Sequence, residues 1–379
     1  MNVSVMQENL ARGLQTVSRA VSSRATLPVL ANVLLKTESS GLKLTATNLE
    51  IGINCWVPGK VAEEGEITVP AKLLTDLVSS FPNQRVDLVL SPKDRTLKVT
   101  CAGSKSSIKG IEADEFPVVA AIGDAPATSV DARALREALG EVVFAAATDE
   151  SRPILTGVLT KLAGSRMTLA AADNYRIAVR HLELASPVNA EMVIVVPGRS
   201  YGELMRILPD GEASVEITVT PNKSQVLFHT EGIDLVSRLI EGQFPNYEPV
   251  IPSSHTSRAV VDREAFLSSA RRASIFARDS ANIVKIALGG EGVDGEEPSA
   301  VSITAHAADI GDAADALEAN LEGTPTTIAF NARYLIDVLS NLGADEAALE
   351  LSGPLAPGVI RGVGKDDYVH VIMPVRTAS

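Results

Sequence analysis

Residues Met167–Val179, with the sequence MTLAAADNYRIAV, contain an alternating apolar run, a small-residue step, an acid and a second apolar run. Alternation of apolar and polar residues at every second position is typical of half-buried β-strands. The stretch therefore predicts two strands joined by a short connection. Asp173, Tyr175 and Arg176 place an acid, a phenol and a guanidinium at this connection, so the same residues could be a catalytic cluster, a recognition surface or the polar end of a strand.

The pattern occurs three times in the chain. LKLTATNLEIGI (Leu42–Ile53) is a clear relative of the quoted stretch, and VSITAHAADIGDA (Val301–Ala313) is a weaker third copy. An amphipathic helical pattern precedes each copy, and a strand followed by a second helical pattern comes after it. Self-similarity on this scale indicates whole repeated domains of about 125 residues rather than turns of a solenoid.

Six segments have apolar residues at helical spacing, and Asp131 and Asp262 are suitable N-caps for two of them. The expected helices cover residues 6–24, 71–81, 131–146, 198–208, 262–279 and 331–342. The helices that precede the three copies have the apolar stripes Leu10, Leu14, Val17, Val21; Leu135, Leu139, Val142, Ala146; and Phe266, Ala270, Ala273, Ala277.

The fold class that follows is α+β, with three tandem domains that each have two helices packed on mostly antiparallel strands. We expect domain boundaries at residues 1–122, 127–252 and 256–379. The connecting segments, residues 121–129 and 251–257, are short and rich in turn-forming residues. Short connections favour a fixed, side-by-side arrangement of the domains.

The composition limits the kind of protein. The chain has 379 residues, 45% of them apolar but only 4% aromatic, which predicts aliphatic cores. Two cysteines, Cys55 and Cys101, without a CxxC pair argue against a disulfide framework. The N-terminus does not resemble a signal peptide, and no apolar run approaches the length of a membrane span. We therefore expect a cytoplasmic protein with no membrane partner.

The charge is unevenly distributed. The formal net charge is −13, which argues against a simple basic nucleic-acid binder. The six expected helices nevertheless hold 13 basic and 10 acidic residues, whereas the rest of the chain holds 21 basic and 37 acidic residues. The helices could simply carry solvated arginines, or they could form one positive face that attracts a phosphate backbone without sequence preference. The count alone does not choose between these readings.

Sequence signatures of an enzyme are absent. The chain has no HExxH, GxSxG or Walker A motif, and its five histidines lack metal-ligand spacing. Gly290–Gly295 matches GxGxxG, but acidic residues and a proline follow it instead of a helix, so an acidic hairpin loop is the better interpretation. Asn222–Ser224 fits a glycosylation sequon, which has no use without export. We therefore expect no catalysis, no metal and no cofactor.

The repeat comparison also argues against a catalytic trio. The first copy has Asn48, Leu49, Glu50 and Ile51 at the matching positions, so the polar side chains are specific to the middle domain. No partner base or cofactor accompanies them. The trio is therefore a surface feature added to a repeated scaffold, and an edge-strand polar patch is the alternative.

Four separated segments resemble one family. RATLPVL (Arg24–Leu30), Asp173–Val179, FPNYEPVIP (Phe244–Pro252) and MPVR (Met373–Arg376) occur in the order typical of bacterial DNA polymerase III beta subunits, the sliding clamps. The resemblance covers essentially the whole chain. It implies a ring formed by a head-to-tail homodimer, with helices lining the hole and sheets on the rim, that encircles duplex DNA without sequence preference and tethers the polymerase.

The resemblance also implies partners and a docking pocket. The partners would be the polymerase III alpha subunit, the clamp loader, and other polymerases and repair proteins that carry a clamp-binding peptide. The pocket would lie between the second and third domains. Its residues would be Leu155, Asn174, Tyr175, Arg176, Ile177, Pro245, Val250, Leu355, Ile372, Met373, Pro374, Val375 and Arg376. A terminal strand packed in the core is the alternative for Met373–Val375.

The resemblance also implies, by matching positions, which residues contact DNA and which form the dimer interface. Arg24, Arg152 and Arg199 would face DNA, although Asp149 and Glu150 place negative charge beside one of them. Pro249 stands where many relatives carry a polar or basic residue. At the dimer interface, Ile275 and Phe276 would meet the partner's strand around Lys105–Ile108. A three-domain peptide-binding scaffold with no DNA function is the main alternative, and an unrecognised hydrolase is another.

Overall fold

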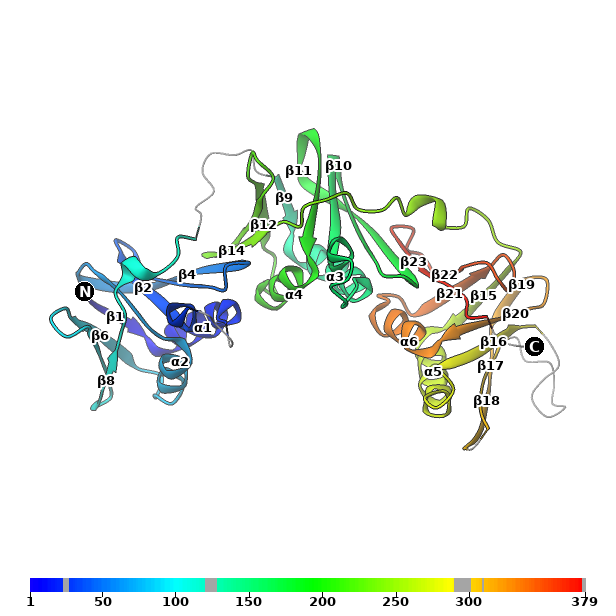
Figure 1. Cartoon of the computed structure of the whole chain (residues 1–379), viewed down its shortest axis with the longest axis horizontal. Helices are drawn as coiled ribbons and strands as arrows, with labels where there is room; N and C mark the ends of the chain where they lie inside the picture. Colours follow the sequence, from blue (N-terminus) through cyan, green and yellow to red (C-terminus); the bar gives the residue numbers. More distant parts are fainter. Residues whose placement is uncertain (23–26, 120–127, 290–300, 309, 377–379) are drawn as a thin grey trace. The chain divides into compact units, whose positions relative to one another are not determined.

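The computed structural model describes residues 1–22, 27–119, 128–289, 301–308 and 310–376. The chain divides into two compact units. The first unit contains residues 1–133 and 199–239, and the second contains residues 134–198 and 240–379. Each unit therefore combines one complete terminal repeat with part of the middle repeat (Figure 1).

The first unit is built on one sheet with α1 (Gln7–Val17), α2 (Ala71–Ser79) and α4 (Gly198–Ile207). The strands are β1 (Asn2–Met6), β2 (Asn32–Glu38), β3 (Gly41–Thr47), β4 (Ile51–Glu63), β5 (Glu66–Pro70), β6 (Arg85–Ser91), β7 (Thr96–Cys101), β8 (Ser104–Lys109), β9 (Thr128–Asp131), β12 (Ser214–Val219), β13 (Gln225–Thr230) and β14 (Ile233–Arg238). Their main order is β8-β7-β6-β1-β4-β14-β13-β12-β9, and β3, β2 and β5 continue from β4.

The second unit contains α3 (Ala132–Val142), α5 (Arg263–Ala277) and α6 (Ala332–Asn341). Its strands are β10 (Gly157–Ala172), β11 (Arg176–Pro197), β15 (Ser257–Asp262), β16 (Ile283–Leu288), β17 (Val301–Ala307), β18 (Gly311–Leu317), β19 (Asn320–Gly323), β20 (Thr326–Asn331), β21 (Glu346–Leu351), β22 (Gly358–Gly362) and β23 (Tyr368–Ile372). They form one sheet in the order β10-β11-β23-β22-β21-β15-β19 and another in the order β18-β17-β16-β20.

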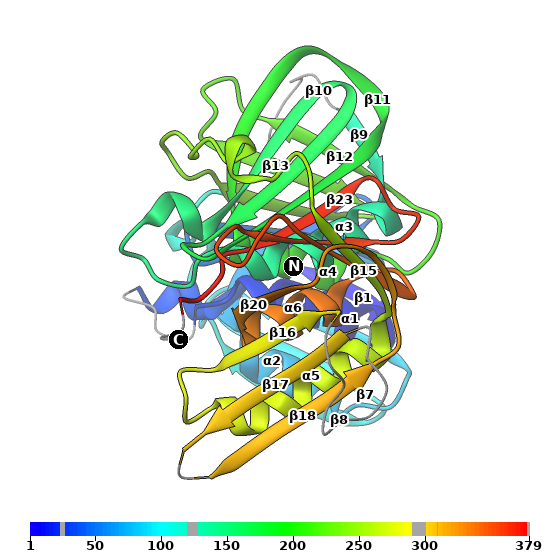
Figure 2. The same ribbon diagram turned by 90° about the vertical axis from the view of Figure 1, so that its right-hand side faces the viewer.

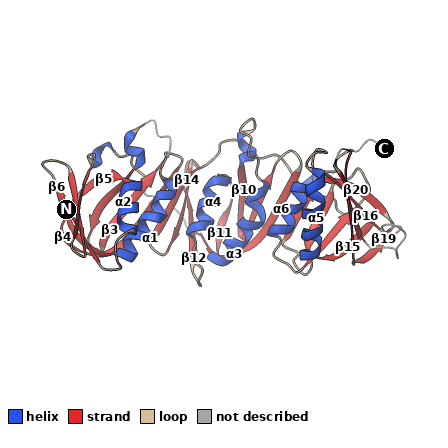
Figure 3. Ribbon diagram, turned by 90° about the horizontal axis from the view of Figure 1, so that it is seen from below, coloured by secondary structure: helices blue, strands red, loops and turns tan. Residues whose placement is uncertain are grey.

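Within each unit, the helices lie on one face of the sheets (Figure 3). Helix α5, for example, packs against β17 and β18 of the four-stranded sheet (Figure 2). The paired strands of the described residues are antiparallel in both units. This arrangement confirms the α+β class of helices on antiparallel sheets. The exact domain boundaries stay a prediction.

The three sequence copies form three equivalent hairpins, β3–β4, β10–β11 and β17–β18. Leu44 pairs with Cys55, Leu169 with Arg180, and Ile303 with Asp315. These register pairs define equivalent positions in the three repeats. The repeat proposed from the sequence is therefore a repeat of structure.

The connection in the opening stretch is a turn held by its acid. Asp173 Oδ1 accepts hydrogen bonds from the backbone N–H groups of Tyr175 (2.7 Å) and Arg176 (3.0 Å). Asn48 Oδ1 does the same for Glu50 (3.0 Å) and Ile51 (2.8 Å). A short Asn or Asp side chain can satisfy backbone donors in this way and so stabilises a turn. Asp173 is thus part of the scaffold.

The six expected helices are present, with small differences at their ends. Helix α1 ends at Val17, a 3₁₀ turn follows over Ser18–Ala20, and Val21 is extended. The prediction of helix across residues 21 and 22 was wrong, and Arg24 lies outside the described residues. Leu10, Leu14 and Val17 are fully buried, but the chain leaves the helix after them so that Ser22 N–H can bond to the Leu30 carbonyl (3.3 Å). Asp262 caps α5 as expected, accepting from Ala265 N–H.

Candidate partner-binding site

One strand pair joins the middle repeat to the third repeat inside the second unit. Strand β11 pairs with β23 from Arg176 opposite Ile372 to Arg180 opposite Tyr368. Residues opposite each other in an antiparallel pair point to the same side of the sheet. One side therefore has Ile177, Val179, Val369 and Val371, and the other side has both arginines with Ala178, His370, Tyr368 and Ile372.

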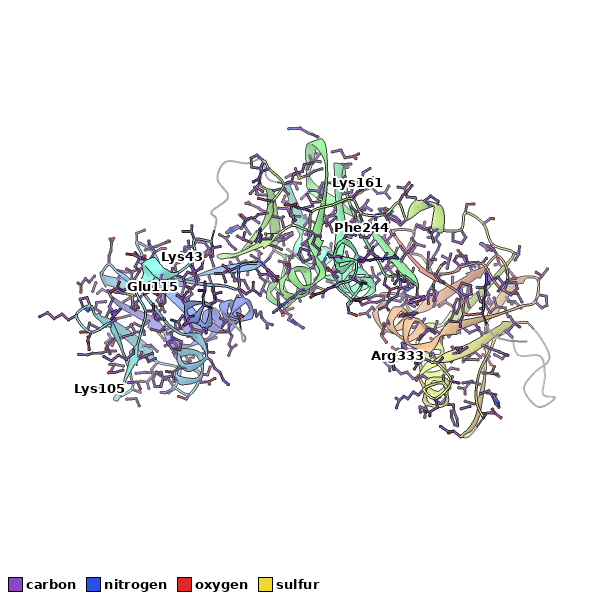
Figure 4. All side chains as sticks on the ribbon, viewed as in Figure 1. Lys43, Lys105, Glu115, Lys161, Phe244 and Arg333 are labelled. Carbon is purple, nitrogen blue, oxygen red and sulfur yellow. The ribbon has the colours of Figure 1, made fainter. Side chains whose placement is uncertain are left out.

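The aliphatic side forms a buried cluster with two segments from outside the sheet. Leu155, from the 3₁₀ turn Pro153–Thr156, and Phe244, from the segment after β14, both pack into it. Figure 4 labels Phe244 beside β10 and β11. The buried members are Leu155, Ala170, Ala172, Ile177, Val179, Val195, Phe244, Val359, Val369 and Val371. Of the expected pocket residues, Leu155 and Ile177 thus lie together in this core, each under 10% exposed.

Four expected pocket residues are large, apolar and exposed. The exposed fractions are 55% for Tyr175, 36% for Val250, 67% for Leu355 and 38% for Met373. Met373 N–H donates to the Tyr175 carbonyl over 2.8 Å, so these two residues are neighbours. Ile251, next to Val250, packs against the buried cluster, and the loop of Leu355 leads into Gly358, which pairs with Ile372. Exposed apolar side chains beside a shared core are typical of a protein-interaction site.

Tyr175 is held in its exposed position by a second tyrosine. Its ring stacks on that of Tyr334 in α6, with a centroid distance of 5.9 Å and an interplanar angle of 20°. Burial, and then the carboxylate of Asp173, raise the pKa of Tyr334. The Tyr334 phenol therefore stays protonated and neutral at ordinary pH. This arrangement gives a stiff aromatic wall at the edge of the exposed residues.

The guanidinium of Arg176 makes its hydrogen bonds to groups of the same chain. Its Nε donates to Asp173 (3.0 Å), Nη1 to Asp337 of α6 (2.5 Å) and Nη2 to the Phe144 carbonyl (2.8 Å). The guanidinium also lies 4.7 Å from the ring centroid of Tyr334. Only 10% of the side chain is exposed. Arg176 is therefore placed to fix the turn and α6, and not to reach into solvent.

Arg180 forms a second link four residues further along the same strand face. Its Nε lies 2.8 Å from Glu141 of α3, and its Nη1 contacts Asp367. Glu141 in turn accepts from the backbone N–H of Gly343 (3.2 Å). Both Glu141 and Arg180 are buried, so removing either would leave a costly unpaired charge.

His370 completes this polar side as a neutral ring. It is fully buried, stacks on Phe144 at 5.5 Å, and its Nδ1 lies 3.4 Å from the Tyr368 hydroxyl. Burial, and then the nearby Arg176 charge, lower the pKa of His370 to about 3. Sequence reasoning missed Glu141, Arg180, Asp337 and His370. The spacing of four between Arg176 and Arg180 in a strand was the available signal, because it places both on one face.

The remaining pocket residues lie at the margins of the buried cluster. Pro245, Asn174 and Arg376 are exposed, Ile372 is buried, and Pro374 and Val375 are half-buried. Val375 N–H donates to the Ala329 carbonyl of β20 (2.8 Å), which fixes the segment after β23. Asn174 Oδ1 accepts from Arg152 Nη1 over 3.1 Å. An arginine assigned to DNA thus contacts a residue assigned to the pocket.

Other predicted contact residues are distributed over both units. Arg199 is exposed on α4. Asp149 accepts from the Ser151 hydroxyl and N–H, which lowers the pKa of its carboxyl and keeps it negative. Pro249 is an exposed residue of the 3₁₀ turn Glu248–Val250. Lys105 (labelled in Figure 4) and Ile108 lie on β8.

Across the described ranges, no cluster of three or more histidine, cysteine or carboxylate side chains could hold a metal ion. None of the described helices is both long and apolar enough to cross a membrane.

Comparison with known proteins gives one consistent family. Three family models match: the N-terminal domain of the DNA polymerase III beta subunit over residues 1–120, the central domain over residues 129–246 and the C-terminal domain over residues 248–376. The beta sliding clamp of Synechococcus elongatus is 33% identical over 382 residues, and that of Bacillus subtilis is 29% identical over 387 residues. Both alignments cover all of each chain.

Solved structures agree. The chain is similar to the crystal structure of the DNA polymerase sliding clamp from Bacillus subtilis, with a TM-score of 0.92 and 29% identity. It is equally similar to the Pseudomonas aeruginosa sliding clamp bound to griselimycin, with a TM-score of 0.92 and 29% identity. Both comparisons cover 100% of each chain.

The neutral His370 predicts a pH-dependent loss of stability. Its pKa is lowered in the folded chain, so below the ordinary pKa of 6.5 the unfolded chain binds a proton that the folded chain excludes. Stability is then lost as pH falls from about 6.5 towards 3. We expect His370→Phe to reduce the difference in unfolding free energy between pH 7 and pH 5 by about 2 kcal/mol.

Urea unfolding at both pH values measures this difference. Tyr368→Phe is the matched control, because it changes the same cluster without removing the histidine, and it should keep the native pH dependence. If His370→Phe has the same pH dependence as the native chain, the assignment to His370 is wrong.

Proposed function

The chain belongs to the family of DNA polymerase III beta subunits, the beta sliding clamps, and on this premise we propose how its own residues close a ring and hold partners. Sliding clamps are DNA polymerase processivity factors and are not catalytic. Ring-shaped dimers are known for the family. The observation that carries the proposal is a pairing between strands of neighbouring repeats. This pairing occurs twice within the chain, and the third repeat hairpin has no equivalent partner strand among the described residues.

The two junctions within the chain have the same form. In each, the second strand of a repeat hairpin pairs with the last strand of the following repeat. In the first unit β4 pairs with β14, and Arg238 N–H donates to the Glu50 carbonyl (2.9 Å). In the second unit β11 pairs with β23, and Met373 N–H donates to the Tyr175 carbonyl (2.8 Å). Equivalent residues therefore make equivalent bonds.

The third hairpin and the first repeat have the matching unpaired strands. Among the described strands, β18 and β8 each lie at the end of a sheet. β18 corresponds to β4 and β11, and β8, like β14 and β23, is the last strand of its repeat. We infer that β18 of one copy pairs with β8 of the other. The register of the two internal junctions predicts Gly311 opposite Ile108 and Asp315 opposite Ser104.

Charge and shape support this register. It places the exposed Lys105 and Lys109 diagonally on either side of Asp312 across the two strands. A Cβ on Gly311 would be 3.9 Å from the Phe276 ring, so the missing side chain leaves room for Ile108. Ile275, 58% exposed, occupies the helix position of Phe144, which packs at the β11–β23 junction. A head-to-tail contact of this kind closes a ring of two chains and pairs both of these sheet edges.

The exposed arginines of the helices suit a hole that is lined by helices and surrounds DNA. Arg12, Arg199 and Arg206 are exposed on helices of the first unit, and Arg271 and Arg278 are exposed on or directly after α5 in the second. Contacts from such arginines to phosphates are independent of sequence and weaken with salt. Arg152 would contact DNA in addition to its hydrogen bond with Asn174. Arg24 is assigned to DNA only by its position in the sequence, and it lies outside the described residues.

The ring then acts by topology: it cannot leave intact circular DNA, and it keeps a bound polymerase at a high effective concentration.

Partners would dock on the exposed residues beside the β11–β23 junction. Tyr175, Val250, Leu355 and Met373 supply apolar contact, and Met is adaptable to different peptides. Arg176 would position Tyr175 instead of binding the peptide itself. The expected partners are the polymerase III alpha subunit, the clamp loader, and other polymerases and repair proteins with a short clamp-binding peptide.

The proposed dimer contact predicts a charge-reversal rescue. Lys105→Glu should place like charges across the two strands and shift the protein from twice 39.8 kDa towards 39.8 kDa at micromolar concentration. Asp312→Lys in the same chain should restore the dimer. Analytical ultracentrifugation measures the mass, and Lys98→Glu on the neighbouring strand β7 is the control that should stay dimeric. A dimeric Lys105→Glu variant, or no rescue, would contradict the register.

The docking residues predict a separation of binding from folding. Leu355→Ala and Met373→Ala should each weaken binding of a synthetic peptide with the clamp-binding segment of the alpha subunit by roughly tenfold, because each removes exposed contact area. Fluorescence anisotropy measures the affinity. Leu73→Ala changes a leucine on α2 whose exposed fraction, 53%, lies between those of Leu355 and Met373, and it should leave affinity unchanged. Native affinity in both site variants would show that partners dock elsewhere.

A further inference from the structure

Three aliphatic side chains in the terminal repeats are largely exposed. Leu73, the third residue of α2, is 53% exposed. Ile275, near the end of α5, is 58% exposed, and Ile310, directly before β18, is 56% exposed. Single exposed aliphatic residues are common on protein surfaces, so exposure alone does not indicate a contact. Their equivalents in the other repeats, however, lie where one repeat meets the next.

The first equivalent position is the residue directly before the second strand of each hairpin. It holds Glu50 before β4, Tyr175 before β11 and Ile310 before β18. At both internal junctions the carbonyl of this residue accepts a backbone hydrogen bond from the following repeat. The Tyr175 side chain also contacts that repeat, because its ring stacks on Tyr334 of α6 with a centroid distance of 5.9 Å.

The second equivalent position lies on the second helix of each repeat. Leu73 and Tyr334 are the third residues of α2 and α6. Tyr334 contacts the preceding repeat through the Tyr175 ring. On α4, Glu203 contacts the preceding repeat through Arg19, with 3.5 Å between the charged atoms. The second helix therefore faces the preceding repeat at both internal junctions, and Leu73 lies on the helix that would face a repeat before the first one.

The third equivalent position comes two residues after the apolar stripe of each first helix has reached its third member. It holds Arg19, Phe144 and Ile275. Arg19 contacts Glu203 of the second repeat, and Phe144 stacks on His370 of the third repeat with a centroid distance of 5.5 Å. This position therefore also contacts the following repeat at both internal junctions.

We propose that Leu73 of one copy packs against Ile275 and Ile310 of a second copy, so that helix α2 belongs to the ring contact. This apolar cluster depends on the ring proposed above and adds to its pairing of β18 with β8. The second copy is the occupant of these exposed positions, because their equivalents meet a neighbouring repeat at the two internal junctions. Burying the three aliphatic side chains together removes apolar surface from water and favours association.

An aliphatic cluster differs from charge pairing in its response to salt. Salt screens exposed ion pairs, whereas it does not weaken apolar contacts. Leu73→Ala should weaken the dimer by roughly a hundredfold, because a ring of two copies has the contact twice and each truncation costs about tenfold. Sedimentation at about 0.15 M and about 1 M NaCl should give a similar weakening, since screening reaches only the charges.

The control for this truncation is Val193→Ala on β11, where the valine is 43% exposed. It should leave the dimer unchanged. The affinity of Leu73→Ala for the partner peptide should also stay native, because the proposed peptide site lies within the second unit of a single chain and α2 belongs to the first.

Cysteine cross-linking tests the contact directly. The full-length chain with both Leu73→Cys and Ile310→Cys is treated with a short, flexible bismaleimide, and the native Cys55 and Cys101 are buried. We expect a covalent dimer of twice 39.8 kDa under denaturing conditions. Neither single variant should link, because a head-to-tail ring holds the same residue of its two copies apart. The pair Leu73→Cys with Val193→Cys is the matched control and should stay unlinked.

Two results would overturn the proposal, and they differ in what they say of the ring. A chain that sediments as a dimer but gives no covalent dimer with the cysteine pair would place α2 outside the contact and leave the ring intact. A chain that is monomeric at micromolar concentration would remove the ring and the apolar cluster together.

Discussion

The backbone of an edge strand must find a partner, and this constraint organises the whole chain. An unpaired strand end presents a row of donors and acceptors that invites association. Each repeat hairpin leaves such an edge, and the last strand of the next repeat covers it twice within the chain, at β4–β14 and β11–β23. Two further sheet edges, β18 and β8, have complementary charge. The pairing proposed for them extends to a second copy of the chain the rule that holds the repeats together.

The two internal junctions share a backbone pattern, and equivalent positions in them and at the open β18 edge hold different side chains. Equivalent helix and strand positions hold Glu141 and Arg180 in one junction, Thr16 and Cys55 in another, and Arg272 and Asp315 beside the open edge. The buried pair Glu141–Arg180, with Arg176 beside it, fixes the strands that present Tyr175 and Met373. A rigid support of this kind lowers the entropic cost of holding a partner peptide.

The sequence was sufficient for the fold, because the fold depends on local patterns of alternation and helical spacing. Alternation and helical spacing predicted the three hairpins and six helices, and the end of α1 was missed because a contact with Leu30 ends the helix before its apolar pattern does. Tyr175, Leu355 and Met373 were assigned to the pocket through the family resemblance. Asp337 and His370 were not, because they approach Arg176 only through the pairing of strands almost 200 residues apart. Glu141 lies in the same repeat as Arg180, but on a helix whose contact with that strand no local pattern shows. The domain boundaries and the individual site residues remain predictions.

The most direct test of the ring is its retention on DNA of different topology. The protein is loaded onto nicked circular DNA by a clamp loader, the salt concentration is raised to suppress phosphate contacts, and half of the sample is linearised. A closed ring should stay with the circular DNA and slide off the linear DNA in high salt. Equal retention on both forms, or equal loss from both, would contradict the account.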